Sequence, residues 1–138
     1  AELPPLRNFG CLEAVISVDT FCQQIAHTHP GSDPDHIGLN TFQDEVTDRI
    51  LNEAGRTLGR VFADMVNLLN PQAVVLGGRL GTAGPALIRG VEASLQRWAQ
   101  PATAAAAKVV PALLGERAEL TGALQLAAAL AARRNASD

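Results

Sequence analysis

Apolar side chains recur along the chain at spacings that predict helices over most of its length. Between residues 11 and 28 they fall three or four positions apart, as on one face of a helix. His29-Pro30-Gly31 then ends the pattern, and the polar stretch over 29–40 contains two prolines and two glycines. A helix over 11–28 followed by a loop is the prediction.

A second and longer helix is predicted to begin at Asn40 or Thr41. Asp44 and Glu45 would then lie in its first turn, where the helix dipole favours acidic side chains. A residue that precedes proline is pushed out of the helical region, so the helix should end at Asn70-Pro71.

Two glycines, Gly55 and Gly59, lie one turn apart inside this long helix. Each should cost the helix about 1 kcal/mol relative to alanine, which close approach of another backbone would offset. The apolar stripe predicted for the helix comprises Phe42, Val46, Ile50, Ala54, Leu58, Val61, Phe62, Met65, Leu68 and Leu69.

The pattern changes after the proline, where strands are predicted. Residues 73–76 form a short, β-branched apolar run that predicts a fully buried strand. A helix over 83–98 and a Pro/Ala connector over 100–107 follow. They lead to a second strand over 108–114, in which Pro111 marks an edge position or the strand's end.

Strand, helix and strand in this order predict a right-handed βαβ unit. A last helix over 117–133 consists largely of Ala and Leu, which predicts packing on more than one face. The fold class is α/β with helices in excess.

Composition and charge argue against some classes of function. The chain has 138 residues, of which 47% are hydrophobic and 4% aromatic, so its core is built from small aliphatic side chains. The net charge is −3 and the 11 basic residues are scattered, which gives no footprint for nucleic acid. Two cysteines predict a reduced, cytoplasmic protein. No apolar run reaches the length of about 18 residues that a membrane span needs.

Four blocks occur in a fixed order: Gly10-Cys11-Leu12-Glu13, then Asn52 to Arg60, then Val66 to Pro71, then Ala73 to Gly78. Together they resemble the ROK family of repressors, open reading frames and sugar kinases, which includes the NagC/XylR-type regulators. The resemblance covers about residues 10–130. It implies the C-terminal lobe of an actin-like, hexokinase-like (ribonuclease H-like, ASKHA) ATPase fold. Residues 1–10 would be an irregular N-terminal segment, and 11–138 a single lobe.

Glu13 matches the family glutamate that accepts hydrogen bonds from sugar hydroxyls, a task suited to the two oxygens of a carboxylate. The resemblance therefore makes Glu13 a candidate sugar-binding residue. The alternative is a glutamate placed at a helix start for its favourable interaction with the dipole.

Cys11 matches the last cysteine of the family's zinc motif, Cys-x-Cys-Gly-x-x-Gly-Cys. Pro4 and Leu6 stand where the other two cysteines would be, and Arg7 where the first glycine would be. Cys22 is about 16 Å along the same predicted helix, beyond ligand range. Structural zinc needs four ligands. Either the site is lost, or the first residues are not the native approach to it. No metal and no other cofactor are expected.

A second group of possible metal ligands is His27, His29, Asp33, Asp35 and His36. The favoured interpretation is a solvated loop with histidines that complement the helix dipole. The resemblance agrees, because this stretch is a variable connector in the family.

Gly77 and Gly78 follow the first predicted strand and match a nucleotide-binding turn of ROK kinases, where absent side chains let the nucleotide reach the backbone. The third glycine of the kinase turn is Arg79 here. Its bulk would fill the nucleotide space; alternatives are a structural turn, and an arginine that contacts a phosphate.

The favoured function is the sugar-sensing or sugar-phosphate-sensing lobe of a ROK transcriptional regulator, whose DNA-binding helix-turn-helix lies outside this chain. A second hypothesis is the lobe of a ROK sugar kinase that phosphorylates a hexose or N-acetylhexosamine with ATP. A third is a structural remnant that only dimerises. No residue of the chain is a candidate general base, so we expect no catalysis by the chain alone. Homo-oligomers are expected, and no membrane contact.

Overall fold

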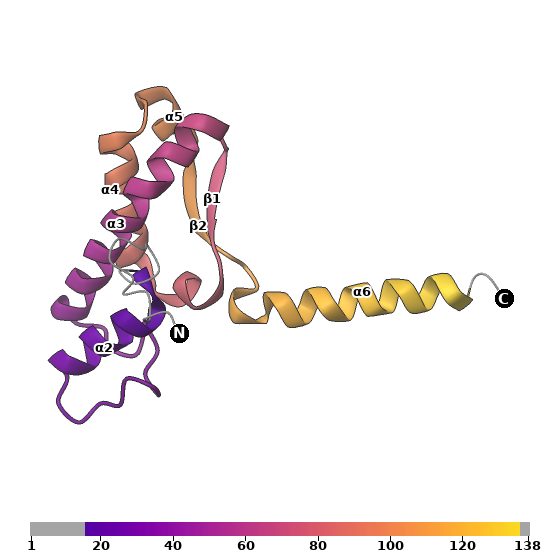
Figure 1. Ribbon diagram of the computed structural model, residues 1–138, viewed down its shortest axis with the longest axis horizontal. Coiled ribbons are helices and arrows are strands. Elements are labelled where there is room, and N and C mark those ends of the chain that lie inside the picture. The colour runs from indigo at the N-terminus through magenta and orange to yellow at the C-terminus, as the bar shows by residue number, and fades with distance from the viewer. Residues whose placement is uncertain (1–15, 136–138) are drawn as a thin grey trace, which may run out of the picture.

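The computed structural model describes residues 16–135, which form a helical body, a small sheet and one projecting helix (Figure 1). The fold is α/β and helix-rich, as predicted. The elements are α2 (Val18–Thr28), α3 (Glu45–Leu69), β1 (Ala73–Leu76), the 3-10 turn η1 (Gly78–Thr82), α4 (Pro85–Trp98), α5 (Pro101–Ala106), β2 (Lys108–Pro111), the 3-10 turn η2 (Gly115–Arg117) and α6 (Ala118–Asn135).

Helix α2 begins later than the sequence pattern predicted. Ser17 is its N-cap: the backbone there is extended, and the Ser17 hydroxyl accepts a hydrogen bond from the Thr20 N–H at 3.0 Å. A continuous helix through Ser17 is therefore wrong, because this serine satisfies an N–H that has no partner within the helix. Residues 11–15 lie outside the described part. The predicted end is confirmed, since α2 stops at Thr28.

Helix α3 begins at Glu45, and the predicted cap at Asn40 or Thr41 is wrong. Asp44 caps the helix, with one carboxylate oxygen accepting from the backbone N–H groups of Val46 at 2.9 Å and Thr47 at 3.0 Å. The Thr41 hydroxyl instead accepts from the Gly38 N–H, closing a turn that precedes the helix. The end is as predicted, with Asn70 in the left-handed conformation at φ 47°.

Helices α3 and α4 pack closely at glycines. A Cβ added at Gly55 would collide with the Leu87 carbonyl oxygen, and one added at Gly59 would lie 2.6 Å from the Val91 carbonyl oxygen. The prediction that these glycines admit another backbone is confirmed. Gly90 does the same from α4, where an added Cβ would collide with the Asn52 carbonyl oxygen.

The glycine contact fixes which face of α3 is buried, and the predicted stripe is only partly correct. Ala54 and Leu58 are buried as predicted, yet Met65 is 51% exposed and Leu68 is 83% exposed. Because the glycine face must meet α4, the core side of α3 is rotated from the predicted stripe. The buried residues of α3 are Thr47, Leu51, Ala54, Gly55, Leu58, Gly59, Ala63 and Val66.

The two strands pair in parallel, with Ala73 opposite Lys108 and Leu76 opposite Pro111. The βαβ unit is thus confirmed, and β2 ends at its proline. A fully buried β1 is wrong within the described residues: Leu76 is buried, but Val75 is 60% exposed. The helices cover one face of this sheet, and no described element covers the other (Figure 1).

The last two helices also depart from prediction. The segment expected as a connector is the short helix α5, begun by Pro101 at a position where its missing N–H costs nothing. Helix α6 has the predicted place but projects from the body (Figure 1). Its leucines are 53–63% exposed, so packing on several faces does not occur within the described chain. Residues 16–135 contain no helix long and apolar enough to cross a membrane.

Candidate functional site

Of the predicted site residues, the structure describes Gly77 and Gly78. Cys11 and Glu13 lie outside the described residues, so the sugar and zinc expectations remain predictions. Gly77 follows β1 directly with an extended backbone, and Gly78 opens η1 with φ +59°. Apart from its chain neighbours, no atom of residues 16–135 lies within 4 Å of a Cβ added at Gly78. The backbone of this turn is therefore open on the Gly78 side.

The turn is wound tightly behind those two glycines. The Gly81 N–H donates to the Gly77 carbonyl oxygen at 3.3 Å, and the Thr82 hydroxyl donates to the Arg79 carbonyl oxygen at 2.7 Å. A Cβ added at Gly81 would lie 2.5 Å from the Leu76 carbonyl oxygen, at the end of β1. The glycines thus allow η1 to fold back on the strand end.

Arg79 joins this turn to helix α2. Its guanidinium lies 3.3 Å from the Asp19 carboxylate and donates to the Cys22 sulfur at 3.5 Å. Cys22 is 1% exposed, and burial raises the pKa of its thiol despite the opposing charge of the guanidinium. Arg79 therefore occupies the space between η1 and α2, a contact that the sequence pattern did not predict.

A second polar contact, also missed from the sequence, joins the end of α2 to the start of α3. The Nδ1 atom of His29 lies 2.8 Å from the Ile25 carbonyl oxygen, and Nε2 lies 2.9 Å from the Asp44 carboxylate. The ring stacks on Phe42, with centroids 3.8 Å apart. Hydrogen bonding to Ile25 and then to Asp44 raises the pKa of His29. When both ring nitrogens are protonated, His29 donates to both acceptors and acts as a clamp between the two helices.

The histidine-rich loop does not gather into a metal site. His29 is engaged with Ile25 and Asp44, while His36 lies 2.7 Å from the Asp33 carboxylate. Within residues 16–135, no group of three or more His, Cys, Asp or Glu side chains is placed to hold a metal ion. Within the described loop, His36 therefore pairs with Asp33, whereas His29 pairs with the cap of α3.

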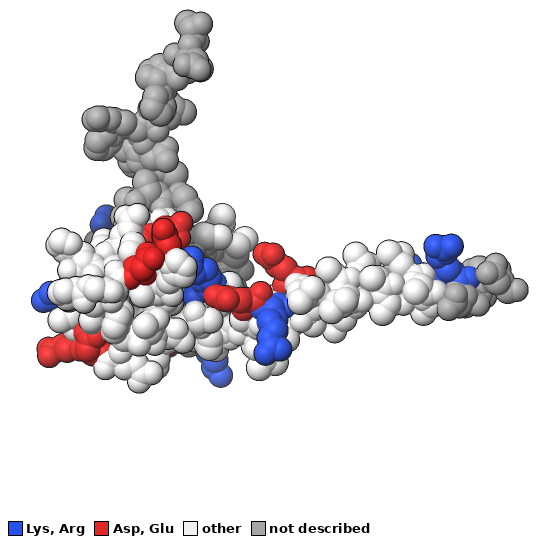
Figure 2. Space-filling view, turned by 90° about the horizontal axis from the view of Figure 1, so that it is seen from below, with Lys and Arg blue, Asp and Glu red and all other residues white. Residues whose placement is uncertain are grey.

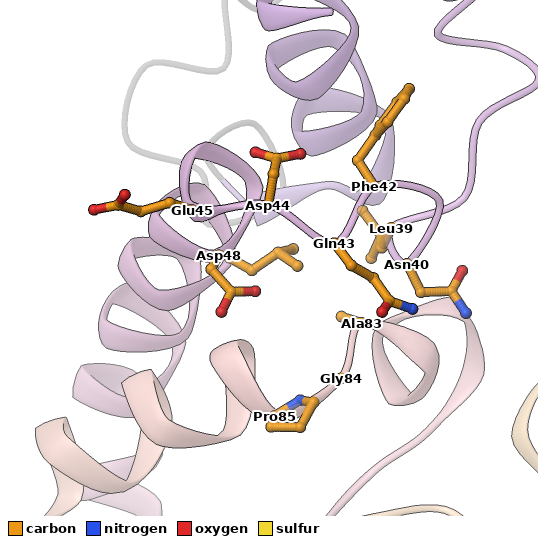
Figure 3. Close-up of a pocket in the computed structure, with 11 residues that line it drawn as sticks. Leu39, Asn40, Phe42, Gln43, Asp44, Glu45, Asp48, Ala83, Gly84 and Pro85 are labelled. Carbon is orange, nitrogen blue, oxygen red and sulfur yellow. The ribbon is translucent and has the colours of Figure 1, made fainter.

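A hollow of about 460 Å³ lies between the start of α3 and the start of α4 (Figure 3). Asp44, Glu45 and Asp48 line it from α3 and its cap; the Asp48 side chain points toward Pro85, whereas those of Asp44 and Glu45 point away from it (Figure 3). The Asp48 carboxylate also lies 3.3 Å from the Arg89 guanidinium. The Asp48 carboxylate at this opening disfavours a polyphosphate, whose charge it would repel. Hydroxyl or ammonium donors would suit this lining better.

Comparison with known proteins matches residues 7–130 to the ROK family, so the chain belongs to the ROK family. It is 29% identical over 106 residues to the DNA-binding transcriptional repressor Mlc of Escherichia coli K12, a match that covers 69% of this chain and 26% of Mlc. It is 25% identical over 124 residues to the DNA-binding transcriptional dual regulator NagC of the same organism, covering 82% of this chain and 30% of NagC.

The chain therefore spans between a quarter and a third of the length of these regulators. Among solved structures, a ROK family transcriptional regulator described as a homologue of the E. coli Mlc protein matches with 24% identity and a TM-score of 0.48. That match covers 73% of this chain and 22% of the regulator.

Proposed function

We propose that the chain is the effector-sensing C-terminal lobe of a cytoplasmic ROK transcriptional regulator. In this proposal Glu13 accepts hydrogen bonds from a sugar or sugar-phosphate effector, and another part of the protein binds DNA. The observation that carries the proposal is the similarity to Mlc and NagC, both of which are described as DNA-binding regulators. A further relative, 25% identical, is described as an N-acetylglucosamine repressor, which supports a sugar as effector.

The lobe would comprise residues 11–138 within an actin-like architecture, preceded by the irregular segment 1–10. Two observations support such a lobe. The two-stranded parallel sheet has a bare face, and parallel sheets are almost always covered on both. Helix α6 exposes its leucines to solvent, although a helix that is apolar all round is normally buried. We infer that other parts of a larger or oligomeric protein cover both surfaces.

Arg79 supports a sensor over a kinase. It replaces the third glycine of the kinase-like turn, and its side chain reaches across to Asp19 and Cys22. Occlusion of the nucleotide space by Arg79 remains a prediction. The alternative function, the lobe of a ROK sugar kinase, is favoured by one observation: the Gly78 backbone is open to approach.

The experiment that separates the two functions uses the full-length protein with its operator DNA. For a regulator, we expect a hexose, an N-acetylhexosamine or one of their 6-phosphates to change DNA affinity at least about tenfold, a coupling of about 1.4 kcal/mol. We expect no phosphoryl transfer from ATP to any of these sugars. Sugar-dependent turnover of ATP would establish the kinase function instead.

A further inference from the structure

Three arginines and one tryptophan meet on an exposed surface formed by α3 and α4, here called the arginine–tryptophan patch. It comprises Arg56, Arg60, Arg97 and Trp98. The Arg60 guanidinium carbon lies 4.8 Å from the Trp98 ring centroid, and that of Arg97 lies 5.3 Å from it. Trp98 is 49% exposed, although large aromatic side chains are usually mostly buried. Both guanidiniums hold the indole by cation–π contacts.

The patch exists because α3 and α4 approach closely. Glycines 55, 59 and 90 remove the side chains that would separate the helices, and the Ser94 hydroxyl donates to the Arg56 carbonyl oxygen at 2.7 Å. Arg56 and Arg60 of α3 thereby lie beside Arg97 at the end of α4. Along the sequence the same residues lie about forty positions apart and look scattered.

The positive charge of the patch is largely uncompensated. None of its three arginines takes part in an ion pair with residues 16–135; Arg56 donates to the Asn52 amide oxygen at 3.1 Å. Glu53 is the acidic residue that lines the same depression. The net charge of the chain is −3, whereas the charge of this patch is positive. Uncompensated guanidiniums attract carboxylates, which they bind with paired, geometrically matched hydrogen bonds.

The shallow, exposed shape of the patch indicates a protein partner. Its depression has a volume of about 360 Å³, and the arginines and the tryptophan that line it are exposed. Small-molecule sites instead enclose most of their ligand. Exposed tryptophan and arginine are the side chains most enriched at the energetic centres of protein–protein interfaces. Three arginines are too few for the extended basic track that binds nucleic acid.

We propose that the arginine–tryptophan patch docks an acidic segment of another protein. The carboxylates of that segment pair with Arg56, Arg60 and Arg97, and one of its apolar side chains packs on the Trp98 indole. The patch contains none of the residues proposed for sugar binding. It would let a protein partner regulate the chain through a surface remote from Glu13 in sequence.

The test measures binding of fluorescent acidic peptides to the full-length protein by anisotropy. The probes are twelve-residue peptides of glutamate with one leucine at varied positions, each matched by a version in which glutamine replaces glutamate. We expect the best acidic peptide to bind and its glutamine version to bind at least tenfold more weakly. Arg60→Glu with Arg97→Glu, and Trp98→Ala alone, should each weaken binding at least tenfold.

Arg117→Glu is the control, because it reverses the charge of one arginine at an exposed site on η2, as each substitution of the double variant does at the patch. It should leave peptide affinity within twofold, and circular dichroism should show that every variant is folded. Hydroxyl-radical footprinting should show Trp98 oxidised in the free protein and protected by the peptide. The proposal is overturned if no acidic peptide binds, if Arg117→Glu weakens binding equally, or if Trp98 is already shielded in the free protein. Tighter binding at the patch by duplex DNA of equal charge would also overturn it.

Discussion

The α3–α4 pair and helix α6 differ in how much of their apolar surface the chain buries. In the pair, glycines meet a neighbouring backbone and leucines such as Leu87 and Leu95 are almost completely buried. In α6, no described atom outside the helix's own backbone lies within 4 Å of a Cβ added at Gly122, and the leucines remain half exposed or more. Figure 2 shows that α6 is almost free of charge between its two ends. The pair is thus specified by contacts inside the chain, whereas the apolar surface of α6 is left largely uncovered by the described residues.

The largest contrast should come from truncating one leucine in each region. Leu87 is 0% exposed, so Leu87→Ala should lower the free energy of unfolding by about 2–5 kcal/mol through lost burial and a cavity. Leu124 is 62% exposed, so Leu124→Ala should change it by less than about 0.5 kcal/mol. Urea denaturation of the isolated chain, followed by Trp98 fluorescence at nanomolar concentration where self-association does not contribute, measures both. Equal losses would mean that α6 packs on the body in solution.

Alanine at a glycine should have opposite effects in the two regions. Gly55→Ala drives a methyl group into the Leu87 carbonyl and should cost about 1–3 kcal/mol by overpacking. Gly122→Ala places its methyl group near no described atom outside the helix backbone and should favour helix α6 by up to about 1 kcal/mol. Denaturation gives the first effect, and helicity by circular dichroism gives the second. If Gly55→Ala proved neutral, the close α3–α4 approach would be wrong.

The exposed leucines of α6 should drive self-association of the isolated chain. Replacing Leu120, Leu124, Leu126 and Leu130 by glutamine removes the apolar surface without adding charge. Sedimentation at micromolar concentration should show oligomers for the parent chain and monomers for this variant. A parent chain that sediments as a monomer and binds no hydrophobic dye would contradict the proposal that a partner covers α6.

The pH dependence of stability is a smaller effect, and it tests the His29 clamp between α2 and α3. Because the folded state raises the pKa of His29 above its ordinary 6.5, the clamp stabilises fully below that pH and fades as the pH rises through the raised value. The pKa of Asp44 is lowered from 3.8 by hydrogen bonds, the largest from the Thr47 N–H, so its contribution is lost as the pH falls through the lowered value. The clamp is therefore strongest between pH 3.8 and 6.5.

Proton NMR of the His29 ring checks this account. Asp44→Asn should lower the pKa of His29 only in part, because the Ile25 carbonyl is the larger cause of the rise. A pKa unchanged by Asp44→Asn would show that the His29–Asp44 contact does not form in solution.

The sequence predicted those elements whose signals are local. Asn70-Pro71 ends α3, and Gly55 and Gly59 indicated a close backbone contact, because each acts through its own conformation or size. Two helix starts were missed although the capping bonds of Ser17 and Asp44 are local. The other misses depend on contacts between distant residues. Which face of α3 is buried follows from its packing on α4, and the exposed Val75 follows from the bare face of the sheet.

In the candidate site, too, features with a local sequence signal were predicted and those that depend on distant contacts were not. Gly77 and Gly78 were found from local pattern, as glycines that follow a strand. The partners of Arg79 could not be predicted, because Asp19 lies sixty residues away and no local pattern specifies that pairing. The arginine–tryptophan patch was missed for the same reason: it needs the α3–α4 contact to exist.

The most direct test of the sensing function is isothermal titration calorimetry of the full-length protein with its sugar effector. Glu13→Gln should weaken binding by about 1–3 kcal/mol, the scale of a hydrogen bond to a charged group, while thermal stability hardly changes. Glu116→Gln, an equal change at an exposed residue of η2, should leave the affinity unaltered. Unchanged sugar affinity in Glu13→Gln would contradict the assignment of Glu13 to the sugar site.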